Sequence, residues 1–486
     1  TPIFLSNDPP LIAGEHRQRF GAGQIVSDAS FLRTRREGEG FPQLRGHLRS
    51  NGRFDLDDNW RTGFDIARAS DKTYIDRYRI RQRFGFIEQD ALTSRGFIEG
   101  FQDRGYAVVS AFAFQGLRPE DDTGRTPLAL PAAAFSWVGE PGRAGGRFTI
   151  DASAVSIYRD KDVRAQRGTI LAGWSLPYTT RSGEIYTLSA NLQTDAFYAS
   201  NAVYGTRDSF QPSENGFNTR ALPQIGLSWR LPLIRRDGTV RTVVEPIAAL
   251  YAAPNVGSQR ELPNEDSRGL TFDDTSLLRV NRFSGQDRLE SGQRLVMGMN
   301  ADVSRTQGQR LTIFLGQQYR TNEESALPIG SGADTRFSDF VGRMILQPHE
   351  WVSASYRFQI DNRDRELLRS VAGLSLGPNA LRYGLSHARI DRSIQPTAAR
   401  SINQLSQTLT TRFDEVWRLT GRVVQSLGTD DGVLLAGATL IYEDDCFLWG
   451  ADFSRRNIGR GDIPPDTALL FRFGFRNLGE LALRGF

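Results

Sequence analysis

A run of charged side chains between residues 262 and 290 is the densest group of potentially reactive residues in this sequence. Its acidic members are Glu265, Asp266, Asp273, Asp274, Asp287 and Glu290, and its basic members are Arg268, Arg279, Arg282 and Arg288. Carboxylates and guanidiniums so close in sequence can form ion pairs, and carboxylates can also bind a divalent cation. Apolar residues that could anchor the run lie among them: Phe272, Leu277, Leu278, Val280 and Phe283. We therefore favour a folded loop, near residues 257–293, held by its own ion pairs, over a solvated loop of mixed charge.

The polar residues that we expect to matter in this loop are Asn264, Glu265, Asp266, Asp273, Asp274, Arg282, Asp287 and Arg288.

Catalytic and metal chemistry have little support elsewhere. The single cysteine, Cys446, allows neither an internal disulfide nor a metal site built on thiolates. The four histidines are scattered, at His16, His47, His349 and His387, and no set of Ser, His and an acid is apparent from the spacing. Because a lipase or protease in a barrel would need such a set, we expect no catalytic residue and no enzyme activity. We also expect no metal site and no cofactor.

The charge balance and the hydrophobic content exclude two classes of protein. Lys+Arg 60 against Asp+Glu 56 leaves a net charge of only +4, and the basic residues alternate with acidic ones, so a nucleic-acid partner is not expected. With 39% hydrophobic residues, no segment approaches the roughly 18 apolar residues of a spanning helix. A helical membrane protein is therefore excluded.

A period of two in the apolar residues predicts the elements that must position the charged loop. Leu188, Ala190 and Leu192 alternate with Ser189 and Gln193, so apolar and polar side chains would occupy opposite faces of a strand. The same pattern returns near residues 294–304 and 352–361. It predicts roughly 24 strands along the chain, with one face suited to lipid or a core and the other to water.

The connections between these segments favour a closed barrel. Short turn signals, as at residues 181–183 and 306–308, alternate with long polar connections, as at 200–216 and 257–293. Outer-membrane barrels show this asymmetry, with short turns toward the periplasm and long loops outside. A soluble propeller is the alternative, but no repeat of about 40 to 50 residues is present. We predict an all-β fold, a large antiparallel transmembrane β-barrel over residues 1–486, whose 257–293 loop reaches into or caps the lumen.

The ends of the sequence fit the same prediction. Phe471, Phe473 and Phe475 alternate with Arg472 and Gly474 near the C-terminus, and Phe486 closes the sequence. A terminal aromatic residue is the usual signal read by the barrel assembly machinery, so we expect these four phenylalanines to mark the strand at the barrel seam. Thr1 opens in what reads as the middle of a strand, which predicts that an N-terminal part has been removed.

Three motifs resemble one known family. They are the loop segments at 262–267, 272–275, 281–290 and 292–298 (LPNEDS, FDDT, NRFSGQDRLE and GQRLVMG), the strand residues Val244-Glu245-Pro246, and Tyr442-Glu443-Asp444-Asp445-Cys446. In order and spacing they resemble the LptD family of outer-membrane lipopolysaccharide assembly proteins. The resemblance implies a barrel of about 26 strands in the bacterial outer membrane, which translocates lipopolysaccharide and inserts it into the outer leaflet.

The resemblance also implies partners. An LptE-like lipoprotein would plug the lumen, and an LptA-like periplasmic bridge would deliver lipopolysaccharide through an N-terminal domain that is missing here. The lipid would leave where the first and last strands meet. Family members usually carry a pair of adjacent cysteines where this chain has only Cys446, which would form a disulfide with the missing N-terminal part or remain unpaired. An outer-membrane porin or nutrient-receptor barrel stays the alternative.

Overall fold

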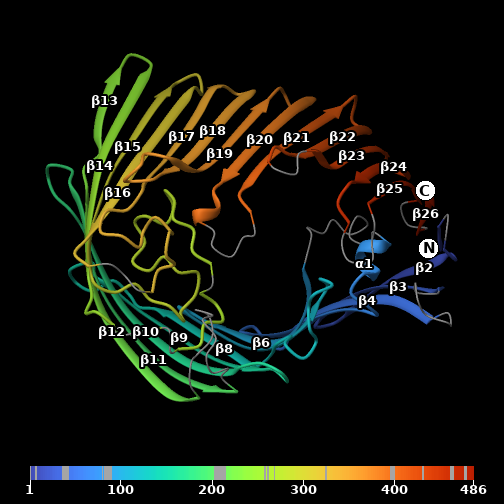
Figure 1. Cartoon of the computed structure of the whole chain (residues 1–486), viewed down its shortest axis with the longest axis horizontal. Helices are drawn as coiled ribbons and strands as arrows, with labels where there is room; N and C mark the ends of the chain where they lie inside the picture. Colours follow the sequence, from blue (N-terminus) through green and yellow to red (C-terminus); the bar gives the residue numbers. More distant parts are fainter. Residues whose placement is uncertain are drawn as a thin grey trace.

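The computed structural model describes residues 2–5, 8–34, 43–78, 80, 90–201, 215–256, 259, 262–267, 269–322, 326–394, 400–428, 432–459, 465–475 and, as backbone, 479–485. Most of these residues belong to one 26-stranded sheet that closes into a barrel (Figure 1). The strands are β1 (Pro2–Phe4), β2 (Leu11–Phe20), β3 (Gly23–Thr34), β4 (Gln43–Asp55), β5 (Trp60–Ala69), β6 (Ala91–Gln102), β7 (Gly105–Gly116), β8 (Leu128–Val138), β9 (Arg147–Tyr158), β10 (Arg164–Thr179), β11 (Ile185–Ser200), β12 (Gly216–Arg230), β13 (Leu233–Asp237), β14 (Val240–Ala252), β15 (Gln293–Arg305), β16 (Arg310–Arg320), β17 (Phe340–His349), β18 (Val352–Ile360), β19 (Leu367–Leu376), β20 (Leu381–Ile390), β21 (Ile402–Arg412), β22 (Trp417–Ser426), β23 (Gly432–Glu443), β24 (Phe447–Arg456), β25 (Asp466–Phe475) and β26 (Gly479–Gly485).

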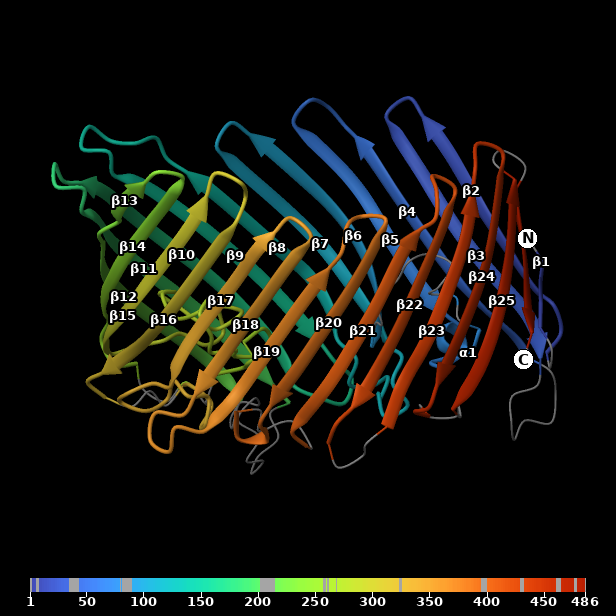
Figure 2. The ribbon, with the colours of Figure 1, turned by 90° about the horizontal axis from the view of Figure 1, so that it is seen from above.

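Apart from β12 and β13, strands that follow one another in the sequence lie side by side and run antiparallel, as β10 and β11 do from Arg164↔Ser200 to Thr179↔Ile185. Short turns gather at one end of the barrel and long connections at the other, as Figure 2 shows with the short turns at the top. Closing the sheet gives backbone groups partners that an open edge would leave unpaired. The predicted all-β fold with a large antiparallel barrel is confirmed.

β12 and β13 form one strand with a local interruption. Both pair with β14, and the register is continuous, because Arg230 lies opposite Ile247 and Leu233 lies opposite Val244. Pro232 stands at the interruption, where its missing N–H removes a possible ladder hydrogen bond. With β12 and β13 counted as one, the described part of the wall has 25 strands, one fewer than the number assigned.

The barrel closes between β1 and β26. Their pairing is parallel and covers two residue pairs, Ile3↔Ala482 and Phe4↔Leu483. Neighbouring strands can all run antiparallel around a closed barrel only if the number of strands is even. With an odd number, one pair of neighbours must be parallel, and here it is β1 and β26. Phe471, Phe473 and Phe475 lie on β25, which pairs with β24 and β26 and is thus one strand away from the seam. Phe486 lies outside the described residues.

The two faces of the wall follow the predicted alternation. On β15, Met297 and Met299 point outward and are 50% and 53% exposed, whereas Val296 points inward and is buried. On β11, Leu188 and Leu192 point outward, and Gln193 points inward. The apolar face therefore faces the surroundings of the barrel and the polar face lines its interior, as expected of a wall between lipid and an aqueous lumen.

Several of the described connections lie inside the ring of strands, and two of them concern us here (Figure 1). The short helix α1 (Tyr74–Arg77), in the connection between β5 and β6, lies near β3 and β4. The described residues between 253 and 292, in the connection from β14 to β15, lie in the opposite part of the ring and are called the lumen loop below. No helix in the described part of the chain is long and apolar enough to cross a bilayer.

Candidate functional site: a loop anchored inside the barrel

An apolar cluster fixes the lumen loop to the wall. Phe272, Leu277 and Phe283 of the loop are buried, and they pack with a cluster that includes Val296 of β15 and Phe314 of β16. Burying a side chain of this size stabilises the folded state by about 1.5–3 kcal/mol. The predicted apolar anchors thus hold the loop inside the barrel. A solvated external loop would not bury these side chains.

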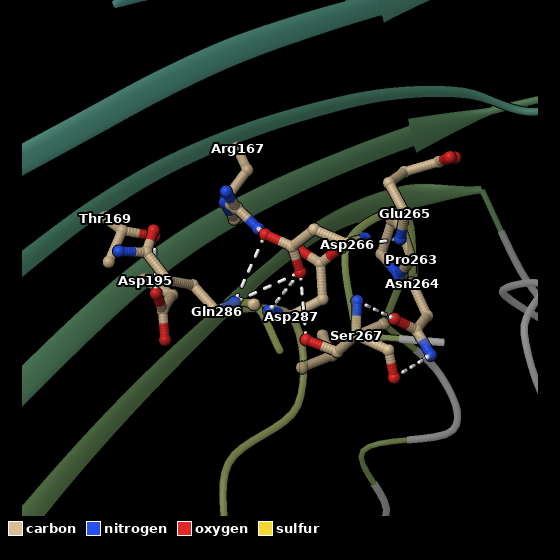
Figure 3. Close-up of polar contacts among 12 residues, drawn as sticks. Arg167, Thr169, Asp195, Pro263, Asn264, Glu265, Asp266, Ser267, Gln286 and Asp287 are labelled. Carbon is tan, nitrogen blue, oxygen red and sulfur yellow. Dashed lines mark hydrogen bonds and ion pairs between the residues drawn. The ribbon is translucent and has the colours of Figure 1, made fainter. Parts of the chain in front are cut away.

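Two aspartates join the two arms of the loop, as Figure 3 shows. The Asp266 carboxylate accepts hydrogen bonds from the backbone N–H groups of Gln286 (3.1 Å) and Asp287 (3.0 Å). The Asp287 carboxylate in turn accepts from the N–H groups of Glu265 (2.6 Å) and Asp266 (3.0 Å). Each aspartate carboxylate therefore binds backbone N–H groups in the segment that contains the other aspartate. We call this arrangement the aspartate clasp.

Arg167 of β10 ties the aspartate clasp to the wall. Its guanidinium donates to Asp266 Oδ2 at 2.6 Å and also to Asp287. Burial alone would raise the pKa of Asp266, but Arg167 and the backbone donors outweigh burial and lower it to about 2. Burial, together with the neighbouring Asp266, raises the pKa of Asp287. One buried cation thus holds two carboxyl groups that would otherwise repel each other.

A second buried ion pair lies beside the clasp, between neighbouring strands. Arg220 of β12 donates to Asp195 Oδ2 of β11 at 2.6 Å, and both side chains are almost fully buried. Arg220 also donates to the carbonyl oxygens of Gln286 (2.7 Å) and Asp287 (2.9 Å). Thr169 of β10 donates to Asp195 at 2.7 Å. Side chains of the wall therefore bind the loop backbone through a buried polar network.

The rest of this arm is held by arginines that bind carboxylates and carbonyls. Arg159, which follows β9, forms a bidentate ion pair with Glu265, with N–O distances of 2.8 and 2.7 Å. Arg288 donates to the carbonyl oxygens of Leu262 (2.9 Å) and Pro263 (3.2 Å), and its burial lowers its pKa to about 10. Asn264 forms a tight turn with Ser267. The predicted residues of this arm are thus brought together.

Glu290 joins the other arm of the loop to β15 and β16. It accepts hydrogen bonds from Arg282, Arg294 and Arg320, and all four side chains are nearly fully buried. Burial would raise the pKa of Glu290, but the three guanidiniums lower it well below its usual range. Arg294 also donates to the carbonyl oxygen of Val280 at 2.7 Å. One carboxylate is therefore shared by three cations.

The tip of the loop reaches across to β17 and β18. Asp274 lies 2.9 Å from Arg343 and 3.6 Å from Arg357, and its burial raises its pKa. Asp273 has a local role, because its carboxylate accepts from the N–H groups of Thr275 (2.9 Å) and Ser276 (3.1 Å). The loop therefore contacts strands from β9 to β18.

The connection between β16 and β17 also packs inward. Asp339 accepts from Gln359 Nε2 of β18 at 2.8 Å and from the N–H of Asn362 at 3.2 Å. Burial raises the pKa of Asp339 to about 6. Gly332 has φ +79°, and a Cβ there would lie 2.1 Å from Asp339 Oδ2, so this close approach requires glycine. Sequence analysis did not predict this site.

A Ser, His and acid set does exist, contrary to the expectation from spacing. Ser30 Oγ lies 2.6 Å from His47 Nδ1, and His47 Nε2 lies 2.9 Å from Asp28 Oδ2. Ser30 Oγ also contacts the Tyr74 hydroxyl of α1 at 2.7 Å, and both residues are buried. A nucleophile needs space for a substrate carbonyl beside it. Here the Tyr74 hydroxyl lies against the buried Ser30 Oγ, so the set attaches α1 to the wall.

Cys446 lies in the turn between β23 and β24, at the short-turn end, and is exposed. The Asp444 carboxylate accepts hydrogen bonds from the N–H groups of Cys446 (2.8 Å) and Phe447. Within the described part of the chain, no group of three His, Cys, Asp or Glu side chains could hold a metal ion. Five lumen-loop carboxylates form ion pairs with arginines, and these contacts anchor the loop: Glu265, Asp266, Asp274, Asp287 and Glu290.

The family model described as LPS transport system D matches residues 43–417. Among curated relatives, the LPS-assembly protein LptD of Hahella chejuensis is 22% identical over 95% of this chain and 58% of its own length. That of Methylococcus capsulatus is 24% identical over 66% of this chain and 30% of its own length. The chain thus spans less than two thirds of the relatives it matches. A solved structure, the ferric enterobactin receptor of Pseudomonas aeruginosa, aligns at a TM-score of 0.44 and 9% identity over 94% of this chain and 78% of that one.

Proposed function

Because the chain belongs to the LptD family, we propose that it forms the barrel through which lipopolysaccharide is translocated and inserted into the outer leaflet of the outer membrane. The family match carries this proposal, since it covers most of the wall and the whole lumen loop. The curated relatives are named as LPS-assembly proteins. The chain is an outer-membrane β-barrel, and a porin or nutrient receptor is not favoured.

The dimensions of the wall support passage of a large polar molecule. A closed sheet of 26 strands encloses a lumen that its own side chains cannot fill. Its inner face is polar, as Gln193 and Arg167 illustrate, so it suits a saccharide head group. The lumen loop closes part of this interior near the long-loop end, where it limits leakage while lipopolysaccharide passes.

The seam is our candidate for the exit of the lipid part. β1 and β26 share two residue pairs, whereas β10 and β11 share an unbroken ladder along their whole length. Fewer ladder hydrogen bonds make a joint easier to open. Acyl chains would then enter the membrane sideways, while the head group stays in the polar lumen.

The partners that we propose follow from this route. An LptE-like lipoprotein would occupy lumen space that the lumen loop leaves free, and an LptA-like bridge would deliver lipopolysaccharide at the short-turn end. Barrel assembly machinery would insert the chain. We propose that Cys446 forms a disulfide to a periplasmic segment, and its exposure at the short-turn end supports this. No catalytic step is required for any of these roles.

Cross-linking the seam tests the proposal. In a Cys446→Ser background, Ile3→Cys with Ala482→Cys would join the facing residues of β1 and β26. Leu374→Cys with Leu385→Cys joins facing residues of the ordinary β19–β20 ladder and is the matched control. We expect oxidation to stop the appearance of new lipopolysaccharide at the cell surface only for the seam pair. Continued delivery through a locked seam would contradict lateral exit, and normal delivery by cells depleted of the protein would contradict the function itself.

A further inference from the structure

β13 has one open edge in the described structure. On one side it pairs with β14 from Leu233↔Val244 to Asp237↔Val240. On the other side the ladder of β11 with β12 ends at Ile185↔Arg230, and residues 180–184 turn back to β10. The five residues of β13 therefore extend beyond their neighbour. Figure 1 shows this hairpin on the side of the ring away from the termini.

The backbone groups on that edge can be identified. Leu231 donates to the carbonyl oxygen of Pro246 at 3.2 Å, so residue 231 bonds toward β14. In an antiparallel ladder the direction of hydrogen bonding alternates along the strand. Leu233, Arg235 and Asp237 therefore also bond toward β14, and the N–H and C=O groups of Ile234 and Arg236 point to the open side.

Other features indicate that this edge is suited to a partner. A comparable overhang on β10, residues 176–179, contains Pro177, which has no N–H to donate and so blunts the edge. No proline lies within β13, and both Leu233 and Ile234 are more than half exposed. Unprotected edges that carry exposed apolar residues are the usual sites of strand addition.

The charge of the hairpin selects the partner. Arg235, Arg236 and Arg241 are exposed, and Asp237 is the acidic residue in the same ladder, 3.5 Å from Arg235. A second copy of β13 would bring arginines opposite arginines, which is unfavourable. A strand with acidic side chains at alternate positions would pair them with arginines instead.

We propose that β13 is a docking edge at the periplasmic rim, where an acidic, extended segment of a partner protein adds as a further strand. Its location follows from the short turns, which face the periplasm in outer-membrane barrels. Main-chain bonds to Ile234 and Arg236 would provide affinity, and Arg235 and Arg236 would provide selectivity.

A labelled peptide of about eight residues with alternating valine and glutamate is the probe, added to the barrel in nanodiscs of zwitterionic lipid. Ile234→Pro removes one open-edge donor without touching the bonds to β14, and Ile234→Val keeps the donor as the matched control. Arg236→Glu reverses one charge. Heat-modifiable migration on gels checks that each variant barrel is folded.

We expect the peptide to bind, to slow exchange of the Ile234 and Arg236 amide protons, and to bind at least about tenfold more weakly to the Ile234→Pro variant while binding Ile234→Val normally. Arg236→Glu should weaken binding of the acidic peptide and strengthen binding of the peptide in which lysine replaces glutamate. Equal binding to the Ile234→Pro variant, or displacement by phosphatidylglycerol vesicles, would reduce the hairpin to a general anionic surface and overturn strand addition. Absence of binding to the parent barrel would also overturn it.

Discussion

Glu290 and Arg320 lie 2.6 Å apart, Oε1 to Nη2, and both side chains are almost completely buried beneath the lumen loop. Arg320 belongs to β16, so this contact joins the end of the loop to the barrel wall. Arg282 and Arg294 share the same carboxylate. Removing its charge would leave three buried guanidiniums without their counter-ion.

Glu290→Gln should therefore release this arm of the loop. Breaking a buried ion pair by removing one partner costs about 3–5 kcal/mol. We expect the loop of the folded variant to become sensitive to protease and the barrel to conduct ions more readily in planar bilayers. Glu350→Gln, in an exposed turn, is the control. Unchanged protease resistance of the Glu290→Gln variant would show that the apolar cluster alone holds the loop.

Gly285→Ala should open the aspartate clasp. A Cβ at Gly285 would lie 2.1 Å from Asp266 Oδ1, so the Asp266 carboxylate has to move away from the N–H groups it binds. Overpacking of this kind costs about 1–3 kcal/mol. Hydrogen exchange at the Asp287 amide should accelerate. Gly269→Ala, where nothing lies within 4 Å, should leave the rate unchanged. Equal rates in the two variants would contradict the packing described.

The connection at Asp339 should loosen as the pH rises. Its pKa of about 6 lies above the ordinary value of about 3.9, so between these values the folded state binds more protons than the unfolded one. Stability contributed by this site is therefore fully present below about pH 4 and is lost as the pH rises to about 6. Hydrogen exchange across residues 331–339, corrected for the intrinsic rate, measures this loss.

Asp339→Asn should remove the pH dependence of hydrogen exchange across residues 331–339. This holds even if the substitution changes the exchange rates themselves. Asp364→Asn, in an exposed turn, should leave the dependence in place. A pH profile that persists in Asp339→Asn would assign the transition to another group.

Thiol labelling should reveal the orientation of the barrel. Cys446 is exposed at the short-turn end, so a membrane-impermeant maleimide should reach it only after the outer membrane is permeabilised. In a Cys446→Ser background, Asp364→Cys at the long-loop end should react on intact cells. Reversed reactivity would mean that the short turns face outward. Protection of Cys446 that ends after reduction would support a disulfide between Cys446 and a periplasmic segment.

Much of the fold could be predicted because a barrel wall between lipid and water requires apolar and polar side chains to alternate along each strand. Residues 188–199 reveal their strand in this way. β13 could not be found, because its five exposed residues carry no such alternation. β26 (Gly479–Gly485) was also missed, because its sequence does not continue the apolar pattern of β25.

The loop half of the candidate site could be predicted from the sequence, but its partners on the barrel wall could not. Phe272 and Asp266 identified an anchored loop, since apolar and acidic residues occur together there. Their partners Arg167 and Arg220 resemble any other polar residue on a strand, and their role depends on the closure of the sheet. Likewise, Ser30 and His47 are 17 residues apart, and they meet because β3 and β4 pair in that register.

The lumen loop also bears on the order in which the barrel forms. Its described polar contacts with the wall join residues 133 or fewer positions apart, as between Ser153 and Gln286, whereas Ile3 and Ala482 stand at opposite ends of the chain. Short closures cost less entropy and form earlier than long ones. The sector from β9 to β18 can therefore nucleate around its own loop, and refolding should proceed from this internal nucleus outward until the two ends of the sheet meet last.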